Sequence, residues 1–436
     1  MIPGGRARAL RGVAAAALAM VVAVVVAGCS GGSPGGAAPV SGGGAGPAGA
    51  TPSVAGSVDG ARPAGSGAAG SGAAGSASGA VNVYAAAGAG MLTPLTRADR
   101  PLVYVPNTLA GTVSVIDPRT YRVVSTFRVG QVPQHVVPSW DLKTLWVNDN
   151  GSDDLVPIDP RTGRPGRKVA VPDPYNLYFT PDGQHAMVMA ERLGRIDFRD
   201  PHTMRLQHSL PVPCHGVNHA DVTADGSTFV VSCEFSGKLL VIPVDGSRVA
   251  KVIDLNAIRT PGATDPMAAM RTGGAASSLD RGASSMPQDV RLVPDGTTFL
   301  AADMMRNGVW LIDAATMSVR GFLPTGRGAH GIYPSRDATS MYVSNRDEGT
   351  VSVVDAATLK VRTRWRIPGG GSPDMGGVTA DGSQLWLSGR SNGVVYVFDT
   401  VTGQITHRIP VGAGPHGLCV WPQPGRYSLG HTGNLR

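Results

Sequence analysis

The sequence is poor in charged residues. Asp, Glu, Lys and Arg make up 16% of its 436 residues, and no run of Lys or Arg stands out. The formal net charge is +7, and without three arginines close to the N-terminus 35 basic residues face 31 acidic ones. Proteins that bind nucleic acid through its phosphates need a concentrated basic surface. We therefore expect no nucleic-acid partner.

Helical periodicity is nearly absent after residue 95. Val, Ile, Thr and Tyr dominate there, in runs of four to six residues separated by turn residues. β-branched and aromatic residues in short runs are typical of strands. The composition therefore predicts an all-β protein.

No apolar run is comfortable as a membrane span. The longest, Val13 to Ala27, follows three arginines and ends in Val26-Ala27-Gly28-Cys29, which resembles a bacterial lipobox. We expect residues 1–28 to be a lipoprotein signal peptide and Cys29 to carry a lipid that anchors the protein on the extracytoplasmic face of the membrane. The alternative is an ordinary secretory signal with an incidental cysteine.

Two segments have no pattern of a packed core. Residues 29–95 consist mostly of Gly, Ala, Ser and Pro, which predicts a flexible tether after the lipidated cysteine. Residues 256–285 interrupt the regular spacing described below and have a similar composition. The folded domain is expected to span residues 96–436, with this insertion as a lid or a simple loop.

A block of sequence returns about every 42 residues. Its first marker is an acidic turn, at Asp141, Asp182, Asp225, Asp295, Asp337 and Asp381, with a degenerate copy at Pro422 to Gly425. Its second marker is an apolar run closed by Asp, at Asp117, Asp159, Asp197, Asp245, Asp313, Asp355 and Asp399. Short strands at this period predict a seven-bladed β-propeller.

The two ends of the repeat region are expected to share one blade. Strands precede the first complete unit, and the last unit stops after its early strands. Both ends of the chain offer a second strand for this closing blade, Leu102 to Val105 from the N-terminal side and Tyr427 to Leu429 from the C-terminal side. We favour Leu102 to Val105, with the tail from Arg426 packing elsewhere. Closure protects the sheet edges of the ring.

Candidate site residues follow from the geometry of propellers. The start of each first strand and the end of each second strand converge on one mouth of the central channel. Histidines occur at the starts of four first strands, at His135, His215 or His219, His330 and His416. In the third repeat the local text favours His215 and the spacing favours His219, so both are kept. The other polar residues expected at the mouth are Asp149, Asn176, Glu191, Glu234, Asp289, Asp303, Arg346, Asp374 and Arg390.

These histidines form a candidate site for a metal or a haem, because neutral imidazole binds copper, iron or zinc. The structural alternative is that each histidine only bonds a loop of the next blade. Cys214 and Cys233 flank one hairpin and are a candidate disulfide. Cys419 lies within an apolar strand and is expected to be buried.

The repeat text resembles the YVTN family of β-propellers. Leu102 to Asn107 with Gly111 to Asp117 carries the resemblance, and Met341 to Asn345 with Gly349 to Asp355 repeats it. The chain is similar to actinobacterial lipoproteins related to the d-type haem domain of nitrite reductase. This resemblance implies haem or copper held over the channel mouth by histidines. No Cys-x-x-Cys-His motif for c-type haem is present.

Three functions are carried forward. The first is a lipid-anchored, monomeric scaffold that binds a protein, glycan or small ligand at the channel mouth. The second is a haem- or copper-dependent oxidoreductase or cofactor-handling protein. The third is a lactone-cleaving or lyase propeller, with a divalent cation held by Glu191, Glu234, Asp303 and Asp374.

Overall fold

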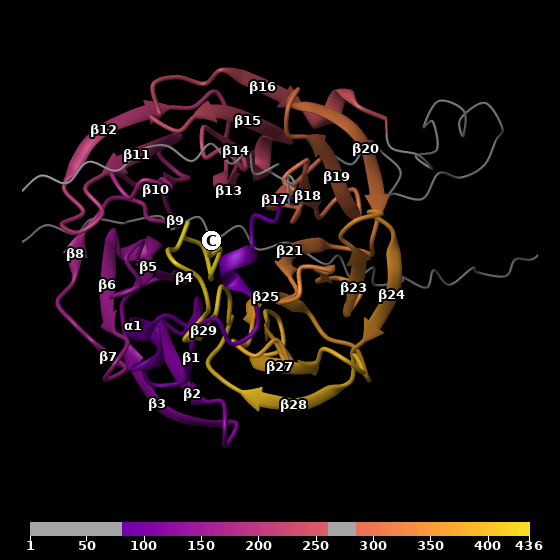
Figure 1. Ribbon diagram of the computed structural model, residues 1–436. Helices are drawn as coiled ribbons and strands as arrows, with labels where there is room; N and C mark the ends of the chain where they lie inside the picture. Colours follow the sequence, from indigo (N-terminus) through magenta and orange to yellow (C-terminus); the bar gives the residue numbers. More distant parts are fainter. Residues whose placement is uncertain (1–80, 260–284) are drawn as a thin grey trace, which may run out of the picture. The chain divides into compact units, whose positions relative to one another are not determined.

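The computed structural model describes residues 81–259 and 285–436. Their strands form seven antiparallel sheets arranged as blades around one axis (Figure 1). The all-β, seven-bladed propeller predicted from the repeats is confirmed. The predicted signal peptide, Cys29, residues 30–80 of the tether and residues 260–284 of the insertion lie outside the described residues.

The strands of each blade run from the axis outward, and we number the blades along the chain. The first blade is β29 (Cys419–Trp421), β1 (Leu102–Asn107), β2 (Thr112–Asp117) and β3 (Arg122–Arg128). The second is β4 (Pro133–Pro138), β5 (Leu145–Asp149), β6 (Asp154–Asp159), β7 (Arg164–Pro165) and β8 (Val169–Ala170). The third is β9 (Asn176–Phe179), β10 (Ala186–Ala190), β11 (Arg195–Arg199) and β12 (Leu206–Pro211). The fourth is β13 (Val217–Val222), β14 (Thr228–Cys233), β15 (Lys238–Pro243) and β16 (Lys251–Asp254).

The remaining blades follow the same order. The fifth is β17 (Pro287–Leu292), β18 (Thr298–Asp303), β19 (Gly308–Asp313) and β20 (Ser318–Pro324). The sixth is β21 (Ala329–Pro334), β22 (Ser340–Asn345), β23 (Thr350–Asp355) and β24 (Val361–Arg366). The seventh is β25 (Pro373–Val378), β26 (Gln384–Gly389), β27 (Val394–Asp399) and β28 (Ile405–Pro410). Short helical turns are η1 (Ala85–Ala87), α1 (Pro94–Arg97), η2 (Asn150–Ser152), η3 (Glu234–Ser236) and η4 (Leu255–Ala257).

The ring closes as the sequence predicted. β29 is the innermost strand of the first blade and pairs with β1, where Val103 faces Val420. Apolar side chains from adjacent blades interleave to form the core, as in the cluster that joins Tyr104 of the first blade to Val136 and Leu145 of the second. Each blade thus covers the apolar face of its neighbour. A single blade would leave that face exposed to water and would not be stable alone.

The repeated aspartates have a structural role. In the turn before β10, Asp182 Oδ1 accepts hydrogen bonds from the Gln184 backbone N–H at 3.0 Å and from the Thr180 hydroxyl at 2.6 Å. The turn before β26 repeats this arrangement around Asp381. A side-chain oxygen that caps a turn in this way holds the first and second strands at a fixed spacing.

Residues 81–95 pack on the propeller, although the sequence assigned them to the tether. Tyr84 is buried, and its hydroxyl donates a hydrogen bond to the Leu292 carbonyl at 2.7 Å. The backbone of this segment bonds to turns of two blades, from Val83 to Pro294 and from Gly90 to Ala380. These turns lie at the end of the channel opposite the mouth, so the segment covers that end. Its low charge and small residues hid this packing in the sequence.

The C-terminal tail enters the channel from the same end, which explains its position at the centre of Figure 1. Gly430 pairs with Tyr178 of β9, and the His431 N–H bonds to the Leu177 carbonyl at 2.9 Å. A Cβ on Gly430 would lie 2.4 Å from that carbonyl oxygen, so only glycine permits the approach.

Buried charges fix the end of the tail. Arg436 bonds Asp221 at 2.9 and 3.1 Å, and its guanidinium lies 4.4 Å from the centre of the Tyr84 ring. The tail from Arg426 therefore packs apart from the closing sheet, as predicted, and it occupies the channel.

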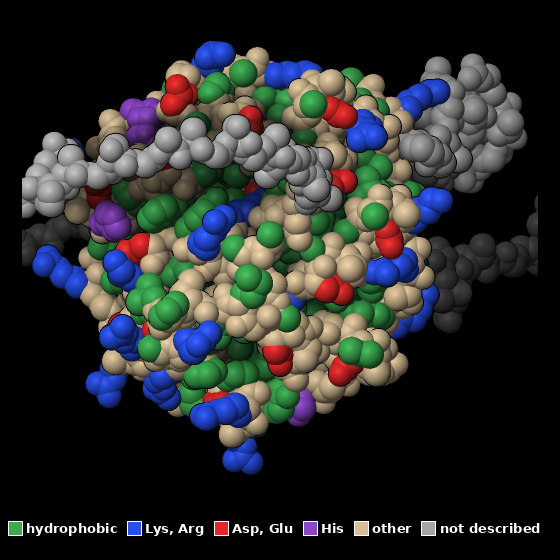
Figure 2. All heavy atoms as spheres, viewed as in Figure 1, with side chains coloured by type: hydrophobic (Ala, Val, Ile, Leu, Met, Phe, Trp, Pro, Cys, Tyr) green, Lys and Arg blue, Asp and Glu red, His purple; other side chains and the backbone are tan. Residues whose placement is uncertain are grey.

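The outer surface on the tail side has mixed charge. Figure 2 shows Lys and Arg interspersed with Asp and Glu on this face rather than gathered in one patch. Among the described residues, no helix has the length and apolar character needed to cross a membrane.

Candidate metal centre

In five of the seven blades a β-bulge at the start of the first strand directs two side chains toward the channel. In the second blade Pro133 faces Asp149 and Val136 faces Val147, so the first strand holds one residue more than its partner between these pairs. The same shift occurs in the fourth, fifth, sixth and seventh blades. Bulges re-aim side chains in this way. The channel wall consequently has two layers of residues.

We name the layers by depth. The mouth layer consists of Gln134, Tyr175, Asn218, Gln288, His330, Asp374 and His416. The inner layer, one residue further along each strand, consists of His135, Asn176, His219, Asp289, Gly331, Met375 and Gly417. Glycine in the inner layer makes room, because a Cβ on Gly417 would lie 2.1 Å from the His135 ring.

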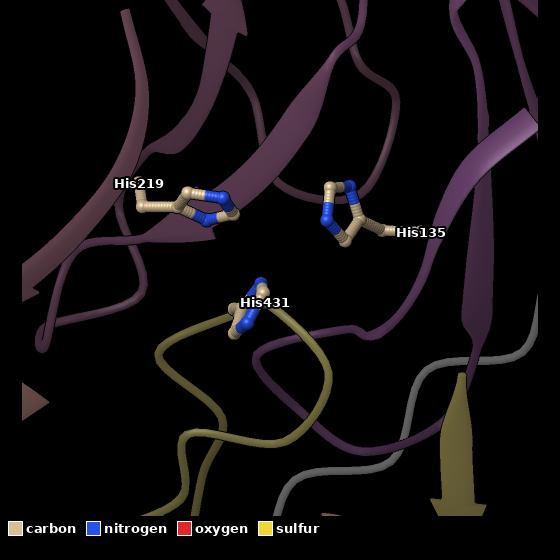
Figure 3. Close-up of side chains that lie close together, drawn as sticks. All are labelled: His135, His219 and His431. Atoms are coloured by element: carbon tan, nitrogen blue, oxygen red, sulfur yellow. The ribbon is translucent and has the colours of Figure 1, made fainter. Parts of the chain in front are cut away.

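The inner layer and the tail together bring three histidines face to face. His135 comes from β4, His219 from β13 and His431 from the tail, and their rings surround one space (Figure 3). One ring nitrogen from each lies within 4.8 Å of the others. All three side chains are fully buried. Figure 3 shows that the loop carrying His431 supplies the third ring of the group.

On each of these rings one nitrogen is held and the other is without a partner. His135 Nδ1 lies 3.0 Å from the Tyr175 carbonyl oxygen, which requires Nδ1 to be the donor. The Asn176 amide nitrogen lies 3.0 Å from His219 Nδ1 and 3.1 Å from His431 Nδ1. Nε2 of all three rings has no hydrogen-bond partner among the described residues. Buried polar atoms without partners are rare and call for an explanation.

The three imidazoles are neutral at physiological pH. Burial lowers the pKa of His135 to about 3, although the bond to Tyr175 opposes this. Burial also places the pKa values of His219 and His431 well below the usual value, and the neighbouring histidines add to the effect. Neutral imidazole is the form that binds metal ions. Ligand atoms about 2.1 Å from a tetrahedral metal are roughly 3.4 Å apart. The three ring nitrogens lie within 4.8 Å of one another, so the group is wider than a filled tetrahedral site.

The mouth layer holds a second group with a different character. His330, Asp374 and His416 also offer donor atoms within 4.8 Å of one another. Here, however, Arg346 is in place: it donates to Asp374 Oδ1 at 2.6 and 3.0 Å and contacts His330 Nε2. A guanidinium beside the donor atoms opposes a bound cation, so this group is better described as an ion-pair network.

The other predicted mouth residues serve different purposes. Asp303 accepts from the Trp310 indole at 2.8 Å and from loop N–H groups, and Asp289 pairs with Arg291 at 3.2 Å. Asp149 lies 3.4 Å from Lys168, and burial raises its pKa to about 6. These contacts stabilise loops and strands.

The predicted carboxylate site is not assembled as a set. Asp303 is used within its own blade and Asp374 by Arg346. Glu191 has an unpartnered Oε1, and Glu234 accepts from Asn218 at 2.7 Å. Burial raises the pKa of both glutamates, and Glu234 raises that of Glu191 further.

His215 does not join the other histidines. It lies in the exposed loop before β13, whereas His219 is four residues further along and inside the channel. The spacing, rather than the similar local text, identified the channel residue. In the same loop Cys214 forms a disulfide with Cys233 across the hairpin. Cys419 is buried, and burial raises the pKa of its thiol.

Sequence reasoning missed His431. The tail lies beyond the last repeat, so no register pointed to it. The signal that could have identified it is Gly430-His431-Thr432-Gly433, in which a histidine stands close to two glycines in a segment that contributes no strand to a blade.

The sequence matches the YNCE-like beta-propeller family over residues 68–201 and 264–424, more than half of the chain. The protein belongs to this family. No curated protein matches the sequence.

Several solved propellers have a similar fold. A protein of unknown function from Desulfotomaculum acetoxidans is 15% identical, with a TM-score of 0.52 over 72% of this chain and 99% of that one. The dihydro-heme d1 dehydrogenase NirN, solved in complex with DHE, is 15% identical, with a TM-score of 0.52 over 76% and 78% of the two chains. Hydrazine synthase of Kuenenia stuttgartiensis is 17% identical, with a TM-score of 0.50 over 71% and 92%. These identities support a shared fold alone.

Proposed function

We propose that this YNCE-like propeller binds a late first-row transition metal ion, Cu(II) or Zn(II), through His135, His219 and His431. The observation that carries the proposal is the group of three buried histidines, which offer one ring nitrogen each within 4.8 Å of the others and whose Nε2 atoms have no hydrogen-bond partner. Three imidazoles suit these metals, which stand high in the order of affinity for nitrogen ligands. Three protein ligands also leave a coordination position for water or a small ligand.

The hydrogen bonds of Asn176 decide which ring nitrogens carry protons in the metal-free protein. Asn176 Oδ1 accepts from the Leu177 N–H at 2.9 Å, so its amide nitrogen donates to Nδ1 of His219 and of His431, and these two rings carry their protons at Nε2. For Nε2 to bind a metal, both protons must move to Nδ1 and Asn176 must release the rings. His135 already has the required form, with Nδ1–H held by the Tyr175 carbonyl oxygen. Groups that hold the far nitrogen of a ligating histidine orient the ring and raise its basicity.

Haem, which the resemblance implied, fits poorly among these rings. The ring centroids of His135 and His416 are 4.8 Å apart, and those of His219 and His431 are 5.0 Å apart. The five channel histidines are at most 2% exposed. A macrocycle needs a wide flat space beside its axial imidazole, so a single ion is the better match to this channel.

The cellular setting is part of the proposal. A lipid on Cys29 would hold the propeller on the outer side of the membrane, where the site could bind metal ions from outside the cell. A test of anchoring is the membrane fraction: the wild-type chain should partition with membranes, and Cys29→Ser should release it. Equal partitioning of the two would count against the anchor.

The metal is tested with the full chain and a matched pair of variants. Wild-type protein, incubated with excess Cu(II) or Zn(II) and desalted, should retain about one ion per chain by elemental mass spectrometry. His219→Gln should lose it, and His215→Gln, which changes an exposed histidine four residues away, should keep it.

The outcomes separate the competing functions. Equal metal content in both variants, with unchanged melting temperatures, would place any metal outside this group and end the proposal. An absorption band of haem would favour the cofactor-handling alternative. A colourless, stable protein that retains no metal would favour a macromolecular scaffold at the channel mouth.

A further inference from the structure

A small cavity lies at the end of the channel opposite the mouth. Its volume is about 20 Å³, counted as the space open to the centre of a water molecule. The N-terminal segment, the fifth to seventh blades and the C-terminal tail all contribute to its lining, which includes Tyr84, Arg291, Arg336, Gly377 and Thr432. None of the described residues that line it is acidic. The cavity therefore joins parts of the chain that are far apart in the sequence.

Arg336, in the turn after β21, is a positive group without a carboxylate in contact. Its Nε donates to the Thr379 carbonyl at 3.0 Å, and Nη2 donates to the Val378 carbonyl at 2.6 Å. Within the described residues Arg336 forms no ion pair. Burial lowers the pKa of Arg336 to about 10, and the charge of Asp381 opposes this only in part. A buried charge without a counter-ion is unfavourable, and a bound anion would relieve it.

Arg291 of β17 brings a second guanidinium to the cavity. It is 2% exposed, its Nη2 pairs with Asp289 at 3.2 Å, and its Nε donates to the Ile332 carbonyl at 3.2 Å. Nη1 of Arg291 and Nη1 of Arg336 carry two N–H groups each. No residue in the described part of the chain accepts a hydrogen bond from either Nη1. Since Asp289 balances Arg291, the two guanidiniums leave one positive charge uncompensated.

The tail adds a third donor of a different kind. Thr432 is 1% exposed and lines the cavity. Its carbonyl accepts from Gln423 at 3.2 Å, but its hydroxyl makes no hydrogen bond with any described residue. A hydroxyl can donate to an anion. Donors without acceptors, and no acidic side chain in the lining, favour an anion over a cation here.

The volume and the charge limit what the anion can be. About 10–15 Å³ of such space holds one water molecule, so the cavity admits a single atom-sized ligand. A sulfate, a phosphate or a carboxylate has several heavy atoms and is too large. One uncompensated guanidinium balances one negative charge. A monatomic, singly charged anion meets both conditions, and chloride is the common anion of this kind.

We propose that this cavity binds one chloride ion through Arg336, Arg291 and Thr432. The ion would connect the fifth blade, the sixth blade and the tail, and so stabilise the end of the channel that the N-terminal segment covers. The site uses none of the three histidines of the proposed metal centre.

The first test uses full-length protein in EDTA, with chloride as the probe. Chloride replaces gluconate, which is too large for the cavity, at constant ionic strength. The melting temperature of the wild type should rise and saturate, because a ligand that binds only the folded chain stabilises it. Arg336→Gln should weaken chloride binding about tenfold or more, because hydrogen bonds to charged groups are among the strongest in proteins. Arg327→Gln, which changes an exposed arginine in the loop before β21, should respond to chloride as the wild type does.

A second measurement locates the ion. Crystals of the wild type soaked in bromide should show a bromine anomalous peak within the cavity, and crystals of Arg336→Gln should not. Thr432→Val keeps the shape of the side chain without its hydroxyl, and it should weaken chloride binding in a protein that stays folded.

Three results would overturn the proposal. They are a wild-type melting temperature that does not depend on chloride, an equal chloride dependence of Arg336→Gln and the wild type, and a cavity that holds only water in the bromide-soaked crystals. Because the protein is free of metal in this experiment, failure here leaves the metal proposal standing, and the reverse also holds.

Discussion

The sharpest consequence of the buried histidines concerns acid. His135 is fully buried, and burial lowers its pKa to about 3, whereas the usual histidine pKa is about 6.5. Below pH 6.5 the unfolded chain binds a proton at this residue and the folded chain does not. The stability that the neutral ring provides is therefore present above pH 6.5 and is lost as the pH falls toward 3.

The size of the effect follows from these two pKa values. At pH 5 the folded imidazole is still neutral and the unfolded one is protonated, which lowers the free energy of unfolding by roughly 2 kcal/mol relative to pH 7. Other channel groups also titrate, including buried carboxyls whose pKa values are raised. They are the same in wild type and in a single-residue variant, so they cancel in the difference.

The assay is a comparison of His135→Gln with the wild type by urea unfolding at pH 7 and pH 5, in the presence of EDTA. The difference in unfolding free energy between the two proteins should shrink by about 2 kcal/mol on going from pH 7 to pH 5. His215→Gln is the control, because it removes an exposed histidine from the loop before β13 and leaves the buried ring of His135 in place.

One result would refute the reasoning. If the gap between His135→Gln and the wild type were the same at both pH values, the ring would take up a proton as readily in the folded protein as in the unfolded chain. It could then not be the buried ring around which the metal proposal is built. The metal experiment alone would not reveal this, since a metal can displace a proton.

Three further predictions follow from particular contacts. Cys214→Ser with Cys233→Ser opens a loop closed over 19 residues and should cost about 3 kcal/mol in urea unfolding; no change would mean that the pair is reduced in the native protein. Asn176→Asp keeps one oxygen for the Leu177 N–H and gives His219 and His431 a second oxygen that accepts from both Nδ1–H groups, so it should tighten metal binding by about tenfold in a chelator competition, whereas weaker binding would show that Nε2 of these rings does not hold the metal. Asp221→Asn removes the charge that pairs with Arg436, and it should lower the free energy of unfolding by about 3 kcal/mol and speed hydrogen exchange of the tail amides. Unchanged exchange would show that apolar contacts alone hold the tail.

The repeats made the architecture predictable. A turn with Asp182 or Asp381 is encoded within a few residues, so its spacing counts blades directly. The closing strand was predictable because a ring must pair its ends. The packing of residues 81–95 could not be predicted, because Tyr84 contacts a surface that exists only after the ring has formed.

The site was predictable in part. The starts of the first strands placed His135, His219, His330 and His416 at the channel, and the structure gathers them there. The bulges were not foreseen, because one extra residue in a strand leaves the apolar pattern almost unchanged. The number of residues between a histidine and the turn aspartate does distinguish the two layers. His330 lies seven residues before Asp337 and belongs to the mouth layer, and His135 lies six residues before Asp141 and belongs to the inner layer.

The position of the last strand and of the tail has a consequence for biosynthesis. β29 completes the first blade, His416 lies just before it and His431 follows it. The ring and the histidine group therefore become complete only after all the other strands of the described blades have been made. A nascent chain still in transit, or one terminated early, lacks both the closing strand and a ligand. The proposed metal would then be acquired only by chains that have finished folding.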